Sequence, residues 1–232
     1  MAKITLRSGE DVKAFIEAQE EARQHACAVF IASRAALRLS SYAIEYFEFN
    51  GLAREWDFVS KFIWRSLLIS GVASNMLNPD VKSSATIAAK ACVEVTDSAQ
   101  FFADRSAVIA SGLAAAAAAA VNFSTPFVAA SNSSNIISTA LYAEVANDGI
   151  LWLEQADQGD GTLAITIAPL WSNENPLERD WQNLRGKLLA ADTTDPRGAD
   201  WSFWVRWYDD ILAGNPQNWD MLHEIVTTDA IE

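Results

Sequence analysis

The most informative stretch of this sequence is residues 200–214, which read DWSFWVRWYDDILAG. At about 100° per residue, most of its apolar side chains share one face of a helix, and the charged side chains lie off that face. The shared stripe consists of Trp201, Trp204, Val205, Tyr208 and Leu212. Gly214 is a typical C-terminal stop for such a helix. The stretch therefore predicts an amphipathic helix with an aromatic inner face.

Helices are also predicted on both sides of this stretch. Upstream, Asn175, Pro176 and Glu178 supply a cap, a first-turn proline and a capping-box partner. The apolar stripe that follows consists of Leu177, Trp181, Leu184 and Leu188. Downstream, Asn215-Pro216 predicts another helix start. Together the segments predict an antiparallel, Trp-rich three-helix subdomain with short turns.

The N-terminal part of the chain also predicts helices. Ser8 and Asp11 form an N-cap arrangement, and the pattern after them predicts one helix from about Gly9 to the late thirties. Further helices are expected over 44–49, 53–75, from 78 towards 97, over 98–121 and over 132–155. The 53–75 helix is apolar around most of its circumference and should be central. The alanines at 114–120 favour close helix packing.

A break between two parts of the chain is predicted at residues 158–161, which read QGDG. Beyond it, Leu163, Ile165 and Ile167 alternate with smaller residues, as in a short strand or an extended segment ending at Pro169. One strand cannot form a sheet, so we favour an extended connector. The prediction is an all-α protein with an Ala-rich helical bundle (1–157), a connector (158–174) and the Trp-rich subdomain (175–232).

Composition limits the classes of function. The 232 residues carry a formal net charge of -13, which opposes bulk attraction to nucleic acid or anionic lipid. Two cysteines and two histidines, scattered along the chain, do not form a usual structural zinc set, so no metal is expected. The polar N-terminal residues lack a signal-peptide pattern, which predicts a cytoplasmic location.

Residues 106–130 form an uncharged stretch that is long enough to span a bilayer. Alanine is nearly neutral on insertion scales, however, and Asn122, Ser124 and Pro126 interrupt the stretch. A core helix is therefore the favoured interpretation. Insertion into a membrane is the alternative.

Candidate partner-binding residues lie along the edge of the aromatic helix. Trp combines a large apolar area with a polar edge, and it is a favoured anchor of protein interfaces. Most aromatic residues of 200–219 fall on inward stripes and are expected in the core. Trp207 is displaced to the edge of its stripe, beside Arg206 and Asp210. We therefore expect Trp207 to be an exposed anchor for a protein partner, with Trp204 next to it.

Arg34 and Arg38 are four residues apart and share a helix face, so they could clamp a phosphate or a carboxylate. Pairing with one of the many acidic residues of the chain is the commoner arrangement. No catalytic residue and no cofactor are predicted, because Walker A, GxGxxG and GxSxG motifs are all missing from the sequence. His25 and Cys27 point about 160° apart on one predicted helix and cannot meet there.

One family resemblance rests on the aromatic helix. The string Asp200-Trp201-x-x-Trp204-x-x-Trp207-Tyr208-x-x-x-Leu212-x-Gly214, preceded by Pro169-Leu170-Trp171, resembles a Trp-rich module of uncharacterised bacterial, mainly alphaproteobacterial, proteins. Residues 32–38 and the Ala-rich middle look like the N-terminal portion of that family. The family has no established activity, so the resemblance implies no functional residue. Its members usually continue past the position of Ile231, so a shortened relative or a fragment is expected.

The sequence thus predicts a non-enzymatic protein–protein interaction or assembly module. It would either self-associate or serve as a regulatory or adaptor part of a larger bacterial system. The alternative is a membrane-active effector that inserts residues 106–130. An enzyme with a composite helical site would require a polar pocket with at least two titratable groups of shifted pKa.

Overall fold

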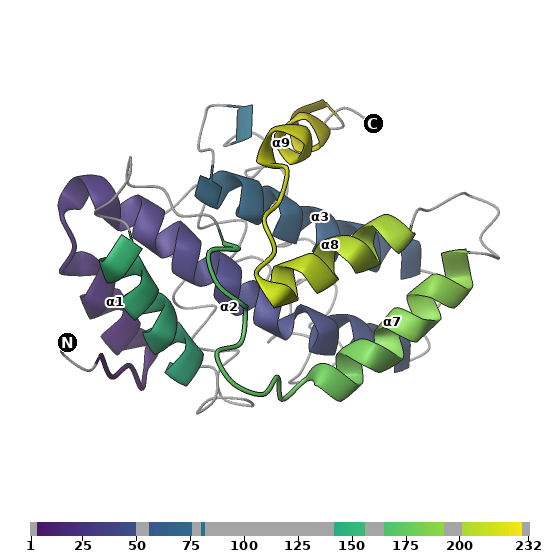
Figure 1. Cartoon of the computed structure of the whole chain (residues 1–232), viewed down its shortest axis with the longest axis horizontal. Coiled ribbons are helices and arrows are strands. Elements are labelled where there is room, and N and C mark those ends of the chain that lie inside the picture. Colours follow the sequence, from purple (N-terminus) through teal and green to yellow (C-terminus); the bar gives the residue numbers. More distant parts are fainter. Residues whose placement is uncertain are drawn as a thin grey trace.

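The structure is a computed structural model, and it describes residues 4–49, 56–75, 80–81, 142–155, 165–192 and 201–228. Within these residues the regular elements are all helices, which confirms the predicted all-α class. The labelled helices of Figure 1 are α1 (Gly9–Glu17), α2 (Glu21–Phe49), α3 (Trp56–Asn75), α7 (Glu178–Asp192), α8 (Trp201–Ala213) and α9 (Trp219–Thr228). A further helix, 142–155, is drawn in teal.

The N-terminal segment forms two helices, so the prediction of one continuous helix is wrong. The side chain of Ser8 caps α1 as predicted, accepting a hydrogen bond from the backbone N–H of Asp11. The chain then turns at residues 18–20 before α2 begins. The Gln19 side chain donates to the carbonyl of Phe15 across this turn, at 2.9 Å. Such side-chain bonds to the backbone compete with the helix, and apolar periodicity does not report them.

Helices α2 and α3 form the centre of the molecule (Figure 1). Helix α2 continues to Phe49 and includes the segment 44–49 that was predicted as separate. The predicted central helix is confirmed from Trp56 to Asn75, and most of its described side chains from residue 64 to 73 are buried. A buried hydrogen bond of 2.5 Å joins the hydroxyl groups of Ser33 and Ser70, so small polar side chains connect the two helices.

The C-terminal helices largely follow the predicted caps. The side chain of Asn175 accepts a hydrogen bond from the N–H of Leu177 at the start of α7. Gly214 ends α8 in the left-handed region, with φ of 73°. Helix α9 begins later than predicted because Asn218 caps it and accepts from the N–H of Met221.

Residues 165–173, which we call the strap, contain turns and bends and no helix or strand. The strap runs against the end of α8, where the N–H of Leu170 donates to the carbonyl of Leu212 at 3.0 Å. A Cβ atom on Gly214 would lie 2.5 Å from the nitrogen of Pro169. Glycine is therefore required at this junction by close packing as well as by its positive φ.

Among the described residues, the buried side chains form two apolar clusters. The larger cluster contains residues of α2, α3, the strap, α7, α8 and α9, so it spans the predicted bundle and the predicted subdomain. The smaller cluster joins α1, α2 and the helix 142–155, where Phe30 packs against Trp152. The core is thus shared across the connector. The predicted domain boundaries stay a prediction.

Several sequence predictions lie outside the described residues. They are the helices over 82–121, the first part of the 132–155 helix, the alanines at 114–120 and the 106–130 stretch. In the part of the chain that the structure describes, no helix has both the length and the apolar character needed to cross a membrane.

Candidate functional site

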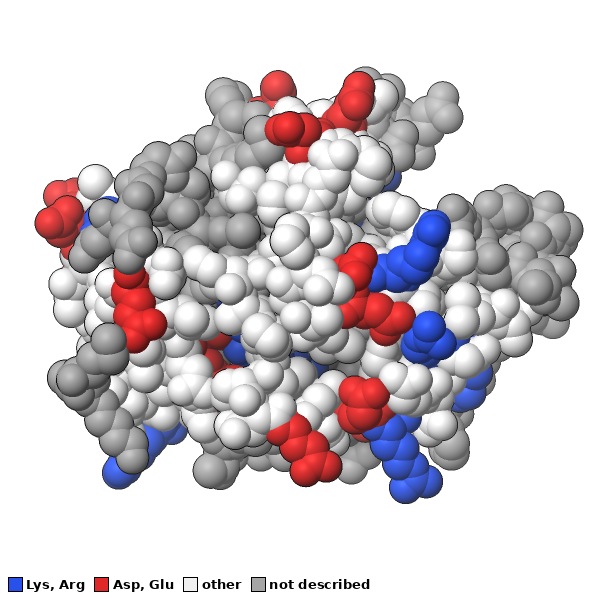
Figure 2. Space-filling model, viewed as in Figure 1, with Lys and Arg blue, Asp and Glu red and all other residues white. Residues whose placement is uncertain are grey.

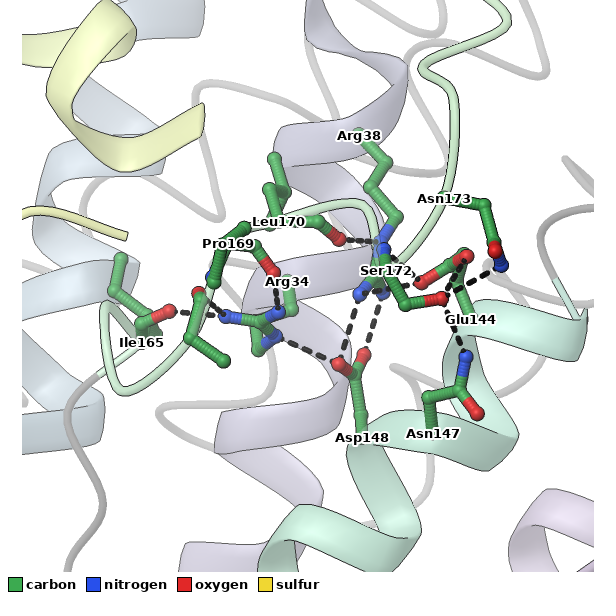
Figure 3. Close-up of polar contacts among 11 residues, drawn as sticks. Arg34, Arg38, Glu144, Asn147, Asp148, Ile165, Pro169, Leu170, Ser172 and Asn173 are labelled. Carbon is green, nitrogen blue, oxygen red and sulfur yellow. Dashed lines mark hydrogen bonds and ion pairs between the residues drawn. The ribbon is translucent and has the colours of Figure 1, made fainter. Parts of the chain in front are cut away.

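Two arginines of α2 lie in the interior of the protein. Arg34 and Arg38 are each 1% exposed, and their side chains project from the same face of the helix. Asp148, from the helix 142–155, faces both guanidinium groups, as Figure 3 shows. Glu144 lies one turn before Asp148 on the same helix. We call these four residues the arginine clamp.

The charges of the arginine clamp balance one another. The Nε of Arg34 donates to Oδ1 of Asp148 at 2.7 Å. Arg38 binds both oxygens of Asp148, with Nη1 to Oδ2 at 2.5 Å and Nη2 to Oδ1 at 2.8 Å. Its Nη2 also lies 3.9 Å from Oε2 of Glu144. Two cations and two carboxylates therefore meet in one buried site, and each cation has a counter-charge.

Four further hydrogen bonds run from the two guanidinium groups to the backbone of the strap (Figure 3). The acceptors are the carbonyl oxygens of Ile165, Ala168, Pro169 and Leu170. The bond from Arg34 to Pro169 and the bond from Arg38 to Leu170 both measure 2.7 Å. A buried carbonyl outside regular secondary structure needs some other donor, and arginine offers five. The arginine clamp thus supplies hydrogen bonds to the backbone carbonyls of the strap, as a neighbouring strand does in a β-sheet.

The end of the strap is tied to the helix 142–155 by a second set of bonds. Glu144 accepts from the N–H of Ser172 at 2.9 Å and from its hydroxyl at 2.7 Å. The side-chain amides of Asn147 and Asn173 donate to the same hydroxyl oxygen, at 2.8 and 3.0 Å. Glu144 therefore fixes the strap directly and also faces the arginine pair.

The electrostatics of the arginine clamp follow from burial. Removal from water lowers the pKa of the Arg34 guanidinium, and the nearby Asp148 carboxylate acts in the opposite direction. Arginine keeps its positive charge in proteins at ordinary pH. Of the two alternatives that the sequence left open for Arg34 and Arg38, the structure shows pairing with an acidic residue of the chain itself.

An aromatic cluster surrounds Trp64 of α3. The ring partners of Trp64 are Trp181, Trp204, Trp207 and Tyr208, at centroid distances of 5.0 to 6.2 Å. The hydroxyl of Tyr208 donates to the carbonyl of Leu37 in α2 at 2.7 Å. Side chains of α3, α7 and α8 thus interlock in this cluster, and Tyr208 links it to α2.

The predicted exposure of Trp207 is wrong, because this side chain is only 3% exposed. Helix α8 contacts Trp64 of α3 and Trp181 of α7, so it buries a wider face than one stripe. Ile211 is buried as well, whereas Leu212 is only partly buried. The indole nitrogens of Trp64, Trp171 and Trp207 are buried and have no hydrogen-bond partner within the described part of the chain.

The other predicted partner-binding residues lie nearer the surface. Trp204 is partly buried, and Arg206 is exposed and donates to the carbonyl of Ser202. Asp210 is partly exposed and accepts from the side chain of Asn215 at 2.8 Å. A role for these residues in partner binding stays a prediction.

Cys27 and His25 are reactive residue types outside the arginine clamp. Cys27 is fully buried, and burial raises the pKa of its thiol, so the thiolate form is disfavoured. The side chain of His25 lies outside the described residues. Across the described ranges, no group of three or more His, Cys, Asp and Glu side chains is arranged to hold a metal ion.

Comparisons with known proteins identify no relative. No family model, no curated protein and no solved structure matches the chain. The resemblance to a Trp-rich bacterial module therefore stays an expectation from the residues of the aromatic helix.

Proposed function

We propose that this protein is an interaction module that presents a rigid, uncharged surface to a protein partner. The observation that supports this function is the arginine clamp, which binds four carbonyl oxygens of the strap. Burying charged groups is costly, yet two arginines are buried here to hold one surface segment. A segment fixed in this way loses little conformational entropy when a partner binds.

The surface in question joins the strap to the junction between α8 and α9. We define it as residues 165–173 and 211–219 and call it the uncharged seam, because neither stretch contains Lys, Arg, Asp or Glu. The two stretches adjoin through the Leu170–Leu212 hydrogen bond and the packing of Pro169 on Gly214. Exposed apolar side chains of the uncharged seam are Ile167, Pro169, Ala213 and Pro216.

The distribution of charge supports the same surface. In Figure 2, a band of uncharged residues crosses the middle of the face, and charged side chains lie directly beside it as well as at the margins. Figure 1, drawn from the same side, shows the strap and the loop between α8 and α9 crossing this middle region. Protein interfaces commonly combine an apolar centre with a polar rim. Asp210, bonded to Asn215, adjoins the uncharged seam and belongs to such a rim.

We propose that the module also has the other properties that its sequence predicts. The module acts in the cytoplasm, as a self-associating unit or as an adaptor within a larger bacterial system. It uses no cofactor and no metal. Trp207 contributes from the core by positioning α8, and Trp204 and Arg206 lie on the same helix.

Site-specific crosslinking in the organism that encodes the protein tests this function. A photoreactive phenylalanine analogue would replace Ile167, which is 38% exposed, and Leu153, which is 48% exposed but lies outside the uncharged seam. We expect a discrete protein adduct from position 167 and none from position 153. Equal adducts from both positions, or none from position 167, would contradict the proposal.

A further inference from the structure

We propose that the helix 142–155 is a latch for the strap, and that the two segments open and close as one unit. The strap is the first stretch of the uncharged seam, so opening of the latch would disassemble this surface. The latch joins two segments of the same chain and does not require a partner on the uncharged seam. The proposed function and the latch can therefore fail separately.

The helix 142–155 and the strap have separate apolar anchors. Val145 and Trp152 of the helix belong to the smaller cluster, which they share with residues of α1 and α2. Ile165 and Leu170 of the strap belong to the larger cluster. All four side chains are at most 5% exposed. Because the two clusters are separate, apolar packing holds each segment in place but does not by itself tie one to the other.

The arginine clamp joins the two segments through buried charge (Figure 3). Arg34 and Arg38 donate the four hydrogen bonds to the carbonyls of the strap. Among the described residues, the ion pairs of these arginines end on Asp148 and Glu144, both of the helix 142–155. Both arginines are 1% exposed, and Asp148 is fully buried. The donors that hold the strap therefore depend on carboxylates of another segment.

The cost of an uncompensated buried charge makes the two segments cooperative. If Asp148 left the site, two cations would stay buried, and carbonyl dipoles do not neutralise a full charge. The guanidinium groups would then move towards water, and the carbonyls of the strap would lose their donors. If the strap left first, water would reach the arginine pair and weaken its bonds to Asp148. The closed arrangement is therefore favourable for both segments together and unfavourable for either one alone.

A second set of bonds joins the same two segments at the end of the strap. Glu144 accepts from the N–H and from the hydroxyl of Ser172, and Asn147 donates to that hydroxyl. Glu144 is only 5% exposed, so its carboxylate also needs these donors when the helix is docked. These bonds run directly from helix to strap, so they break when either segment opens.

Amide hydrogen exchange of the full chain, measured by NMR, tests the latch from both ends. Trp152→Phe loosens the anchor of the helix, and its remote reporters are the amides of Leu170 and Ser172 in the strap. Ile165→Val loosens the anchor of the strap, and its remote reporters are the amides of residues 150–152 in the helix.

The matched control is Ile69→Val, which makes the same change as Ile165→Val at a buried position of α3 in the larger cluster. Circular dichroism melting checks that each variant is folded. Ile165→Val removes little volume, so it keeps the test decisive if Trp152→Phe does not fold.

Each variant of the latch should speed exchange in both segments by the same factor, because a coupling between two sites is reciprocal. A factor of about fivefold is expected for Ile165→Val, the usual effect of one buried methylene group. Ile69→Val should leave both sets of amides within about twofold of the wild type, since opening of the latch does not uncover α3.

Faster exchange confined to the altered segment would overturn the latch. An equal rise in Ile69→Val and Ile165→Val would also overturn it, because the two segments would then open only with the whole protein. Crosslinking from position 167 reports on the proposed function separately. An adduct without coupling would sustain the interaction function alone, and coupling without an adduct would sustain the latch alone.

Discussion

The arginine clamp and the aromatic cluster around Trp64 join C-terminal segments to α2 and α3 by different kinds of interaction. Around Trp64, aromatic rings pack edge-on and stacked at centroid distances of 5.0 to 6.2 Å. Such apolar contacts stabilise strongly but tolerate small shifts. In the arginine clamp, each guanidinium nitrogen donates to a defined acceptor. Directional bonds of this kind fix position. We conclude that the aromatic cluster mainly stabilises the fold, whereas the arginine clamp mainly fixes the conformation of the strap.

The largest effect is expected from removing the shared carboxylate. Asp148→Asn preserves the shape but leaves two buried arginines with only Glu144 as counter-charge, which should cost about 3–5 kcal/mol of unfolding free energy. Asp209→Asn is the control, because Asp209 pairs with Arg185 at 3.0 Å on a surface where both side chains are more than one-third exposed, and the Asn oxygen can still accept from the Trp181 indole. Its loss should be below about 1 kcal/mol. Urea denaturation measures the free energy of unfolding of both variants. Equal losses of this free energy would contradict the expected difference between the buried and the exposed ion pair.

A smaller effect is expected within the aromatic cluster. Trp181 and Trp207 are both buried, but among the described residues only the Trp181 indole has an acceptor, Oδ1 of Asp209 at 2.9 Å. Replacing either residue with Phe removes similar volume. Trp181→Phe also removes a hydrogen bond, so it should destabilise by about 1 kcal/mol more than Trp207→Phe. If urea denaturation gave the larger loss for Trp207→Phe, the indole of Trp207 would have an acceptor beyond the described residues.

Some features of this fold could be predicted from the sequence alone, and others could not. Caps and stops are local, so Ser8, Asn175 and Gly214 could be assigned correctly from neighbouring residues. The turn at 18–20 was missed because glutamine side chains bonded to backbone carbonyls make it, and the apolar pattern continues through it.

The candidate site depended on contacts that no local pattern encodes. Arg34 and Arg38 share a helix face by their spacing, and so do Glu144 and Asp148, which is a matching signal. The pairing itself joins positions 110 to 114 residues apart, which periodicity cannot report. Trp207 was misplaced for a related reason. A one-stripe rule describes a helix packed on one side, whereas α8 packs against two helices.

Amide hydrogen exchange by NMR tests most directly whether the arginine clamp makes the strap rigid. The N–H of Leu170 donates to Leu212, and that of Ser172 donates to Glu144, so both report on the strap. In the wild type, both amides should exchange at least about a thousandfold more slowly than in an unstructured peptide. In Asp148→Asn, they should exchange within about tenfold of the unstructured rate. Rapid exchange of both amides in the wild-type protein would contradict a clamped strap and the preformed surface that depends on it.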